Sequence, residues 1–339
     1  MKQQKAPYAP STLKRLYSKL DLELAPLGLD VTVLNDYVQA CANFYQIIEV
    51  EEAWKMMPRA LPKSNRLKSI PRGVFDAFLS IAARDAEKGY RILQDKELYD
   101  DGGEGLYIIC GALLIAPNPD FGEKELKRYK ACAAKGEAYT GVSPEIITYA
   151  NFYALQEQRE GKPIYVPREI LKYLDKDYYE KTPQVVAMEK FLRKIGVPNA
   201  DVRLAMVLML ADICDIGIPM RDLPEAVMAD IEEYGGKVKG IQQYRQYLDL
   251  LTDLSNNTSM PSNRGFTPNE LHAKMSGGLP KQLSFGPGIQ KSIKDGELDA
   301  GEMRRMILSS DLPDELKASM LGELSRVSRD AKNAKSVSR

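Results

Sequence analysis

Apolar positions along most of the chain follow the 3.6-residue period of an amphipathic α-helix. In the N-terminal third this period predicts helices over 11–20, 33–45, 51–57 and 74–88, with a brief extended step at Ile47-Ile48. Seven further helices are predicted in a row, each ending near Gly or Pro: 123–137, 144–159, 168–174, 183–195, 201–216, 223–234 and 241–254. Such a series of helices predicts bundle packing.

A different pattern lies between the two helical blocks. Residues 90–93 and 105–109 are short apolar runs on either side of the turn-rich stretch 99–103, and together they predict a β-hairpin. Three helices followed by a hairpin is the element order of a winged-helix module. The sequence therefore predicts a mainly α fold, with a winged-helix-like N-terminal module carrying a small β-hairpin, followed by an α-helical bundle.

Changes in composition divide these elements into segments. Glycine and proline are concentrated at 276–288, where a domain boundary is expected. The expected parts are a loosely attached basic N-terminal arm (1–30), the winged-helix-like module (31–120), a helical bundle domain (121–275), a linker (276–299), short C-terminal helices (300–327) and a disordered basic tail (328–339).

The overall charge excludes one simple class of function. Forty-seven basic and forty-seven acidic residues cancel, so no chain-wide field marks a general binder of nucleic acid or membrane. The first residues lack the apolar core of a signal peptide, and the apolar run 204–211 is far shorter than a membrane-spanning helix. We expect a cytoplasmic protein without a membrane partner.

Residues suited to catalysis or metal binding are sparse. The four cysteines (Cys41, Cys110, Cys132 and Cys214) are far apart, and His272 is the single histidine, so no metal site and no cofactor are predicted. Asp212 and Asp215 lie one turn apart, and we interpret them as partners of Arg203 or Arg221 in a buried ion pair rather than as magnesium ligands. No catalytic residue is predicted, and the chain is not expected to be an enzyme.

The polar run 255–271 is the most distinctive local feature. Thr267, Pro268 and Glu270 have the spacing of a helix N-cap, a first helical proline and a capping box. Asn257, Asn263 and Arg264 are candidate partner-binding residues, and Arg264 has no evident structural role. A minor alternative treats residues 256–264 as an active site together with His272.

A second candidate site is the basic loop that precedes the third predicted helix. This stretch carries five cations and no acidic residue: Arg59, Lys63, Arg66, Lys68 and Arg72. Its place in a winged-helix-like module is near the surface that such modules use for nucleic acid. Winged helices also serve as protein-binding or purely structural modules, so this pattern alone does not decide between the alternatives.

Several short blocks resemble a family of uncharacterised bacterial helical proteins of Gram-positive type that often end in a SEC-C zinc motif. The resemblance covers roughly residues 35–272, and its most specific block is 263–271 (NRGFTPNEL). The looser blocks are 42–48, 52–54, 97–102, 163–167, 179–183 and 256–258. The cysteine-rich SEC-C tail is absent here, so the resemblance implies no zinc binding and no particular activity.

Two functions from different classes follow from the sequence. One is a non-enzymatic helical interaction protein that docks a protein partner through the polar loop and the basic arm. The alternative is a nucleic-acid-binding regulator that uses the basic loop 59–72. The sequence pattern indicates no particular oligomeric state.

Overall fold

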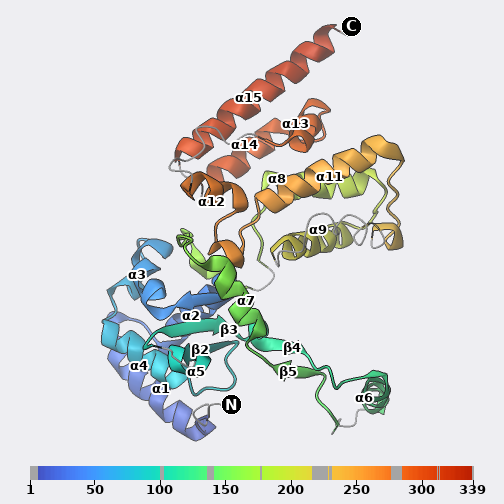
Figure 1. The fold of residues 1–339 in the computed structure, drawn as a ribbon. Helices are drawn as coiled ribbons and strands as arrows, with labels where there is room; N and C mark the ends of the chain where they lie inside the picture. The colour runs from blue at the N-terminus through green and yellow to red at the C-terminus, as the bar shows by residue number, and fades with distance from the viewer. Residues whose placement is uncertain are drawn as a thin grey trace. The chain divides into compact units, whose positions relative to one another are not determined.

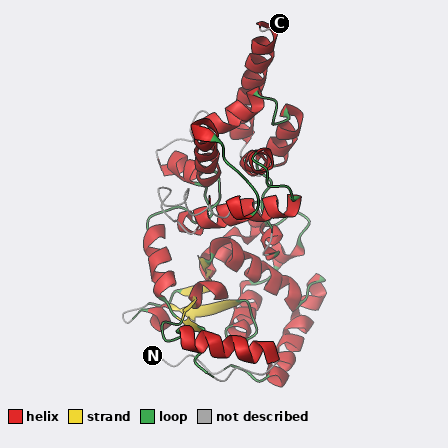
Figure 2. Cartoon of the chain, turned by 90° about the vertical axis from the view of Figure 1, so that its right-hand side faces the viewer, coloured by secondary structure: helices red, strands yellow, loops and turns green. Residues whose placement is uncertain are grey.

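The computed structural model describes residues 7–99, 103–135, 141–175, 178–215, 228, 231–275, 285–310, 312 and 314–337. It is mainly helical and carries small antiparallel sheets, as Figure 2 shows, which confirms the predicted fold class. The chain divides into two compact units, one made of Met1–Glu160 and Val166–Lys176 and the other of Gly161–Tyr165 and Asp177–Arg339. Among the described residues, no helix is long and apolar enough to cross a membrane.

The first unit has the element order of a winged helix (Figure 1). An additional N-terminal helix, α1, precedes that order. The elements are α1 (Pro10–Leu24), α2 (Val31–Tyr45), β1 (Ile47–Glu49), α3 (Val50–Ala60), α4 (Arg72–Ala82), β2 (Tyr90–Gln94) and β3 (Leu106–Cys110). The strands form an antiparallel sheet in the order β1-β3-β2, in which Ile108 of β3 lies opposite both Ile48 and Ile92.

Helix α2 is the centre of this unit. The side chain of Asp30 caps it by accepting hydrogen bonds from the backbone N–H of Thr32 and Val33, at 2.9 and 3.3 Å. Most of the helix is buried, and the hydroxyl of Tyr37 donates a 2.5 Å hydrogen bond to the carbonyl of Ala53 in α3. This bond satisfies the only polar atom of a fully buried side chain.

Three elements of the first unit differ from the sequence expectation. Helix α1 (residues 10–24) is longer than the predicted helix 11–20 of the N-terminal arm, and it buries Leu20 and Leu24 and packs on α4. The predicted extended step Ile47-Ile48 lies in a third strand, β1, because β3 pairs with residues 47–49. Helix α4 ends at Ala82 rather than near residue 88. Beyond it, the buried carboxylate of Asp85 accepts hydrogen bonds from the Tyr17 hydroxyl of α1 and from a backbone N–H.

A two-stranded ribbon extends the first unit beyond the sheet. Strand β4 (Ile115–Pro117) pairs antiparallel with β5 (Glu145–Ile147), and helix α6 (Glu123–Lys135) lies between them in sequence. Figure 1 shows α6 at the end of this ribbon. The expected helix 144–159 is therefore correct only in its later part, α7 (Ala150–Arg159), because β4 draws residues 145–147 into a strand.

The second unit is a helical bundle with its own core. Its helices are α8 (Pro183–Lys194), α9 (Ala200–Asp215), α11 (Gly240–Asn256), α12 (Pro268–Met275), α13 (Pro287–Lys294), α14 (Ala300–Ser309) and α15 (Asp314–Val337). Helix α11 contacts α8, α9 and α13, and α15 contacts α13 and α14. One continuous apolar cluster, from Val185 to Val327, draws on α8, α9, α11, α13, α14 and α15. Because each of these helices turns an apolar face toward the core, the sequence of this part of the chain shows the apolar period of a helix.

Some expectations for the second unit are changed or fall outside the described residues. Residues 287–294, within the stretch 276–299 that was expected as a linker with a short helix at 289–293, form α13, whose Ile289 and Ile293 are buried. Helix α15 continues to Val337, past the expected start of a disordered tail at residue 328. Most of the predicted helix 223–234 and the stretch 276–284 lie outside the described residues.

Candidate interaction site

The five cations of the basic loop do not form one surface of equivalent charges. Arg59 lies exposed in the last turn of α3, and Lys63 is exposed in the turn that follows. Lys68 is half-buried in the 3-10 helix Arg66–Ser69, which the side chain of Asn65 caps. These three cations remain candidates for contact with an external anion.

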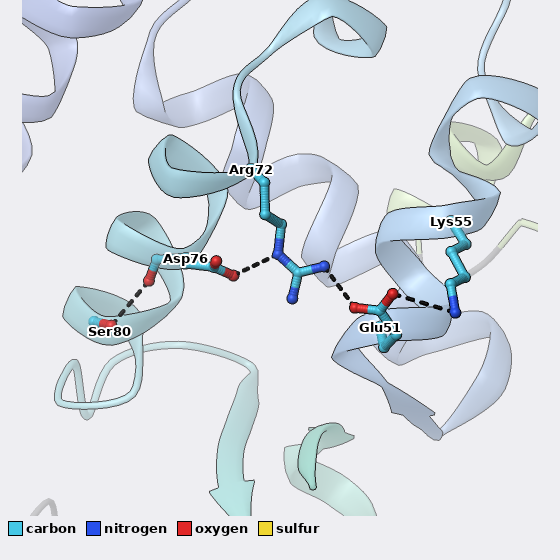
Figure 3. Close-up of polar contacts among 5 residues, drawn as sticks. All are labelled: Glu51, Lys55, Arg72, Asp76 and Ser80. Carbon is cyan, nitrogen blue, oxygen red and sulfur yellow. Dashed lines mark hydrogen bonds and ion pairs between the residues drawn. The ribbon is translucent and has the colours of Figure 1, made fainter. Parts of the chain in front are cut away.

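Arg72 is held by two carboxylates (Figure 3). Its Nη1 donates to Glu51 at 2.7 Å, its Nε donates to Asp76 at 2.8 Å, and the guanidinium lies 5.4 Å from the centre of the Trp54 ring. Glu51 also pairs with Lys55 at 3.2 Å, and the hydrogen bonds from Arg72 and then Lys55 lower the pKa of Glu51 below its usual value. The charge of Arg72 is therefore compensated within the unit.

Arg66 also makes an internal contact. Its guanidinium lies against Gly28, where a Cβ atom would be only 2.4 Å from Nη1, and it donates a 3.5 Å hydrogen bond to the carbonyl of Leu27. Gly28 has a φ of 66°, in the left-handed region that glycine adopts without strain. This arginine therefore packs the loop against the turn between α1 and α2.

The elements that a helix-turn-helix protein presents to DNA carry little positive charge here. Helix α4 corresponds to the recognition helix, and its exposed positions are Gly73, Asp76, Ala77 and Ser80. The wing, residues 95–105, contains five acidic residues and one lysine in its sequence: Asp95, Glu97, Asp100, Asp101 and Glu104, with Lys96. Phosphate groups would meet a nearly neutral face on α4.

The polar loop of the second unit is tied to a distant segment of the same unit. Asn263 is buried, and its Oδ1 accepts a 2.9 Å hydrogen bond from the ammonium of Lys162. The same ammonium donates to the carbonyl of Ser262 at 3.0 Å. Asn257 ends α11, and its amide donates to the carbonyl of Asp253 at 2.8 Å. These bonds give both asparagines a structural role.

Arg264 has a structural role that the sequence did not indicate. It adopts the left-handed conformation, with a φ of 54°, directly after the 3-10 turn Pro261–Asn263. Its Nη1 donates to the carbonyl of Lys162 at 2.9 Å, while its own carbonyl accepts from the N–H of Tyr165 at 3.0 Å. The expectation that Arg264 lacks such a role is wrong because its partners lie about a hundred residues earlier.

The predicted capping box at the start of α12 is confirmed. The Thr267 hydroxyl accepts from the Glu270 N–H at 3.2 Å, and the Glu270 carboxylate accepts from the Thr267 N–H at 3.0 Å. Burial raises the pKa of Glu270, and its hydrogen bonds with Thr267 oppose that shift. His272 is exposed on α12, as expected for a surface histidine.

The potential metal-ligating side chains do not come together in the described part of the chain. Within it, no group of three or more His, Cys, Asp or Glu side chains is placed to hold a metal ion. The side chains of Asp212 and Asp215, and all of Arg221, lie outside the described residues. Arg203 lies 3.9 Å from Glu189 and donates to the carbonyls of Val197 and Pro198.

Sequence reasoning missed the partners that hold these candidate residues. The spacing of Arg72 and Asp76 is the i, i+4 spacing of a helical ion pair and could have been read locally. The contacts of Glu51 with Arg72 and of Lys162 with Asn263 could not have been predicted in this way, because the tertiary fold brings each pair together from distant positions in the chain.

Comparison with known proteins gives no relative. No family model, curated protein or solved structure matches the chain. The resemblance to bacterial helical proteins with a SEC-C motif therefore stays a hypothesis.

Proposed function

We propose that the protein is a non-enzymatic interaction protein that docks a protein partner. The observation that supports this most directly is the charge of the winged-helix-like module. Its α4 face is small and nearly neutral, Arg72 is paired with Glu51 and Asp76, and the wing is acidic in sequence. Such a surface offers little attraction for phosphate and suits a protein, because the core of a protein interface is depleted in charged residues.

The docking surface proposed here is the exposed face of α4. Ala77 and Ser80 are small and exposed, and Asp76 is partly engaged with Arg72. Small side chains allow close approach of a partner backbone or helix. The polar loop with Asn257, Asn263 and Arg264 remains the other proposed contact region, although its side chains already hold the second unit together.

A pull-down from the extract of the source organism tests this proposal, with the full chain as bait and with or without nuclease. A specific protein is expected to be retained in both conditions, and Ala77→Arg on α4 is expected to lose it. Ala154→Arg is the matched control, because Ala154 is an exposed helical alanine on α7. If the Ala77→Arg variant retains the partner as well as the wild type does, α4 is not part of the interface. The absence of any specific partner would contradict the function itself.

The alternative is a nucleic-acid-binding regulator, favoured by the exposed Arg59 and Lys63. It predicts that partners vanish after nuclease treatment and that duplex or RNA binding weakens steeply as salt rises. Under this alternative Lys63→Ala lowers affinity more than Arg72→Ala, because the charge of Arg72 is already paired. Undetectable binding at low ionic strength would exclude it.

A further inference from the structure

Helix α6 is the one α-helix of the first unit whose described side chains include no buried residue. Leu126 is 40% exposed and Tyr129 is 42% exposed, although they lie one turn apart on the same face. The ring of Tyr129 meets Phe121 edge to face at 6.0 Å, and this contact leaves much of the face open. A helix of 13 residues is marginal without packing, so this face is suited to a partner.

The charges on either side of this apolar face are arranged symmetrically. Glu123 and Lys130 lie on one flank, two turns apart, and they are equally far from the midpoint between Leu126 and Lys127. Glu125 and Arg128 lie on the other flank and are equally far from the same midpoint. They form an ion pair at 3.1 Å within the helix. Acidic residues thus precede the midpoint on both flanks and basic residues follow it.

We propose that α6 is a self-association site, in which the helix packs antiparallel against α6 of a second copy of this chain. In that arrangement each flank meets the same flank of the second copy in reverse order. Glu123 faces Lys130 of the second copy, Glu125 faces Arg128 of the second copy, and Leu126 packs at the two-fold axis. The interface is isologous, so each opposite-charge pair occurs twice.

Other occupants fit this surface less well. A nucleic acid would meet Glu123 and Glu125 beside the lysines, and phosphate groups gain nothing from an exposed Leu126. A parallel pair of helices would bring like charges together on both flanks. The antiparallel second copy is the arrangement that pairs all four flanking charges and covers the apolar stripe in one step.

Sedimentation equilibrium of the pure full chain at low ionic strength tests the proposal. The wild-type protein is expected to dimerise reversibly as concentration rises. Glu123→Lys and Lys130→Glu are each expected to weaken the dimer about tenfold, because each converts two opposite-charge pairs into two like-charge contacts. Lys124→Glu is the matched control, since Lys124 lies on the opposite face of α6 and its reversal should leave the dissociation constant near the wild-type value.

Mixing supplies the decisive measurement. Glu123→Lys and Lys130→Glu are complementary to one another, so an equimolar mixture of the two variants is expected to form a heterodimer as tight as the wild-type dimer. Circular dichroism of each variant checks that the fold is retained. A wild-type chain that is monomeric at all concentrations, or a mixture no tighter than its components, overturns the proposal. Failure of self-association can be told apart from failure of the proposed partner docking, because the sedimentation experiment contains only the purified chain.

Discussion

At the scale of single residues, Gly286 shows how closely the second unit is packed. It is the N-cap of α13, and a Cβ atom on it would lie 1.5 Å from the Oδ1 atom of Asp253 in α11. Two helices thus approach each other at a point where any side chain is excluded. The close approach places the carboxylate of Asp253 at the N-terminal turn of α13, where it accepts a hydrogen bond from the N–H of Ile289.

Replacement of this glycine is expected to be costly. Gly286→Ala should lower the free energy of unfolding by about 1–3 kcal/mol, because Asp253 must move and α13 with it. Gly322→Ala is the matched control: nothing lies within 4 Å of its Cβ position in the middle of α15. There, alanine should stabilise the protein by about 0.5–1 kcal/mol through its higher helix propensity. Urea unfolding of both variants measures the contrast, and equal effects would contradict the packing described.

The carboxyl group of Asp253 predicts a pH dependence of stability. Burial raises its pKa to about 6 from the ordinary value of 3.8, the nearby Asp249 adds to the rise, and the hydrogen bond from Ile289 opposes it. Because the folded state binds the proton more tightly, the contribution of this group to stability is full below pH 3.8. It is lost as pH rises through about 6.

Asp253→Asn removes this penalty while keeping an oxygen that can accept from Ile289. The variant should be more stable than the wild type at pH 7, by at most about 3 kcal/mol. The difference should shrink toward pH 4. Urea unfolding of both proteins over this pH range makes the measurement. A variant that is less stable at pH 7 would show that the ionised carboxylate is favoured at the N-terminus of α13.

The residues predicted correctly from sequence are those whose partners lie close by in the chain. The capping box of Thr267 and Glu270, for example, spans three residues. Arg264 was misjudged because its hydrogen bond to Lys162 spans 102 residues. The local pair of Arg72 with Asp76 was overlooked, and the contact of Arg72 with Glu51 spans 21 residues. No local pattern carries that information.

At the scale of elements, periodicity identified helices with large buried faces and failed where pairing decides the outcome. The hairpin of β2 and β3 was predicted because turn residues separate two apolar runs. Strand β1 and strand β5 are only three residues long, and each exists because a partner strand lies beside it. The period of α6 was evident in sequence, but nothing there indicated that its described side chains would be left without a core.

At the scale of the whole molecule, neither unit is a single continuous segment. Residues 161–165 belong to the second unit and residues 166–176 return to the first. In the returning segment, Ile170 is fully buried, and the ring of Tyr173 lies 4.3 Å from that of Phe44. The amide of Asn43 donates to the carbonyl of Tyr173 at 2.8 Å. The returning segment therefore belongs to the core around α2.

This interleaving predicts how fragments behave. A fragment of residues 1–176 should fold and melt cooperatively, whereas 1–160 should lose at least about 1.5–3 kcal/mol of stability from the buried Ile170 alone. Thermal unfolding followed by circular dichroism compares the two. Ile170→Ala in the 1–176 fragment is the control, because it removes the same buried side chain without shortening the chain. Equal stability of 1–160 and 1–176 would contradict the assignment of residues 166–176 to the first unit.

The bond from Lys162 to the polar loop also has a consequence for synthesis on the ribosome. Lys162 leaves the ribosome about a hundred residues before Asn263 and Arg264, which at an elongation rate of about 5–20 residues per second corresponds to a delay of roughly 5–20 s. During that interval the first unit can complete its core. Residues 161–165 meanwhile lack their hydrogen-bond partners Asn263 and Arg264. The nascent chain thus exposes Tyr165 and the Lys162 ammonium to chaperones and proteases until the loop after α11 emerges.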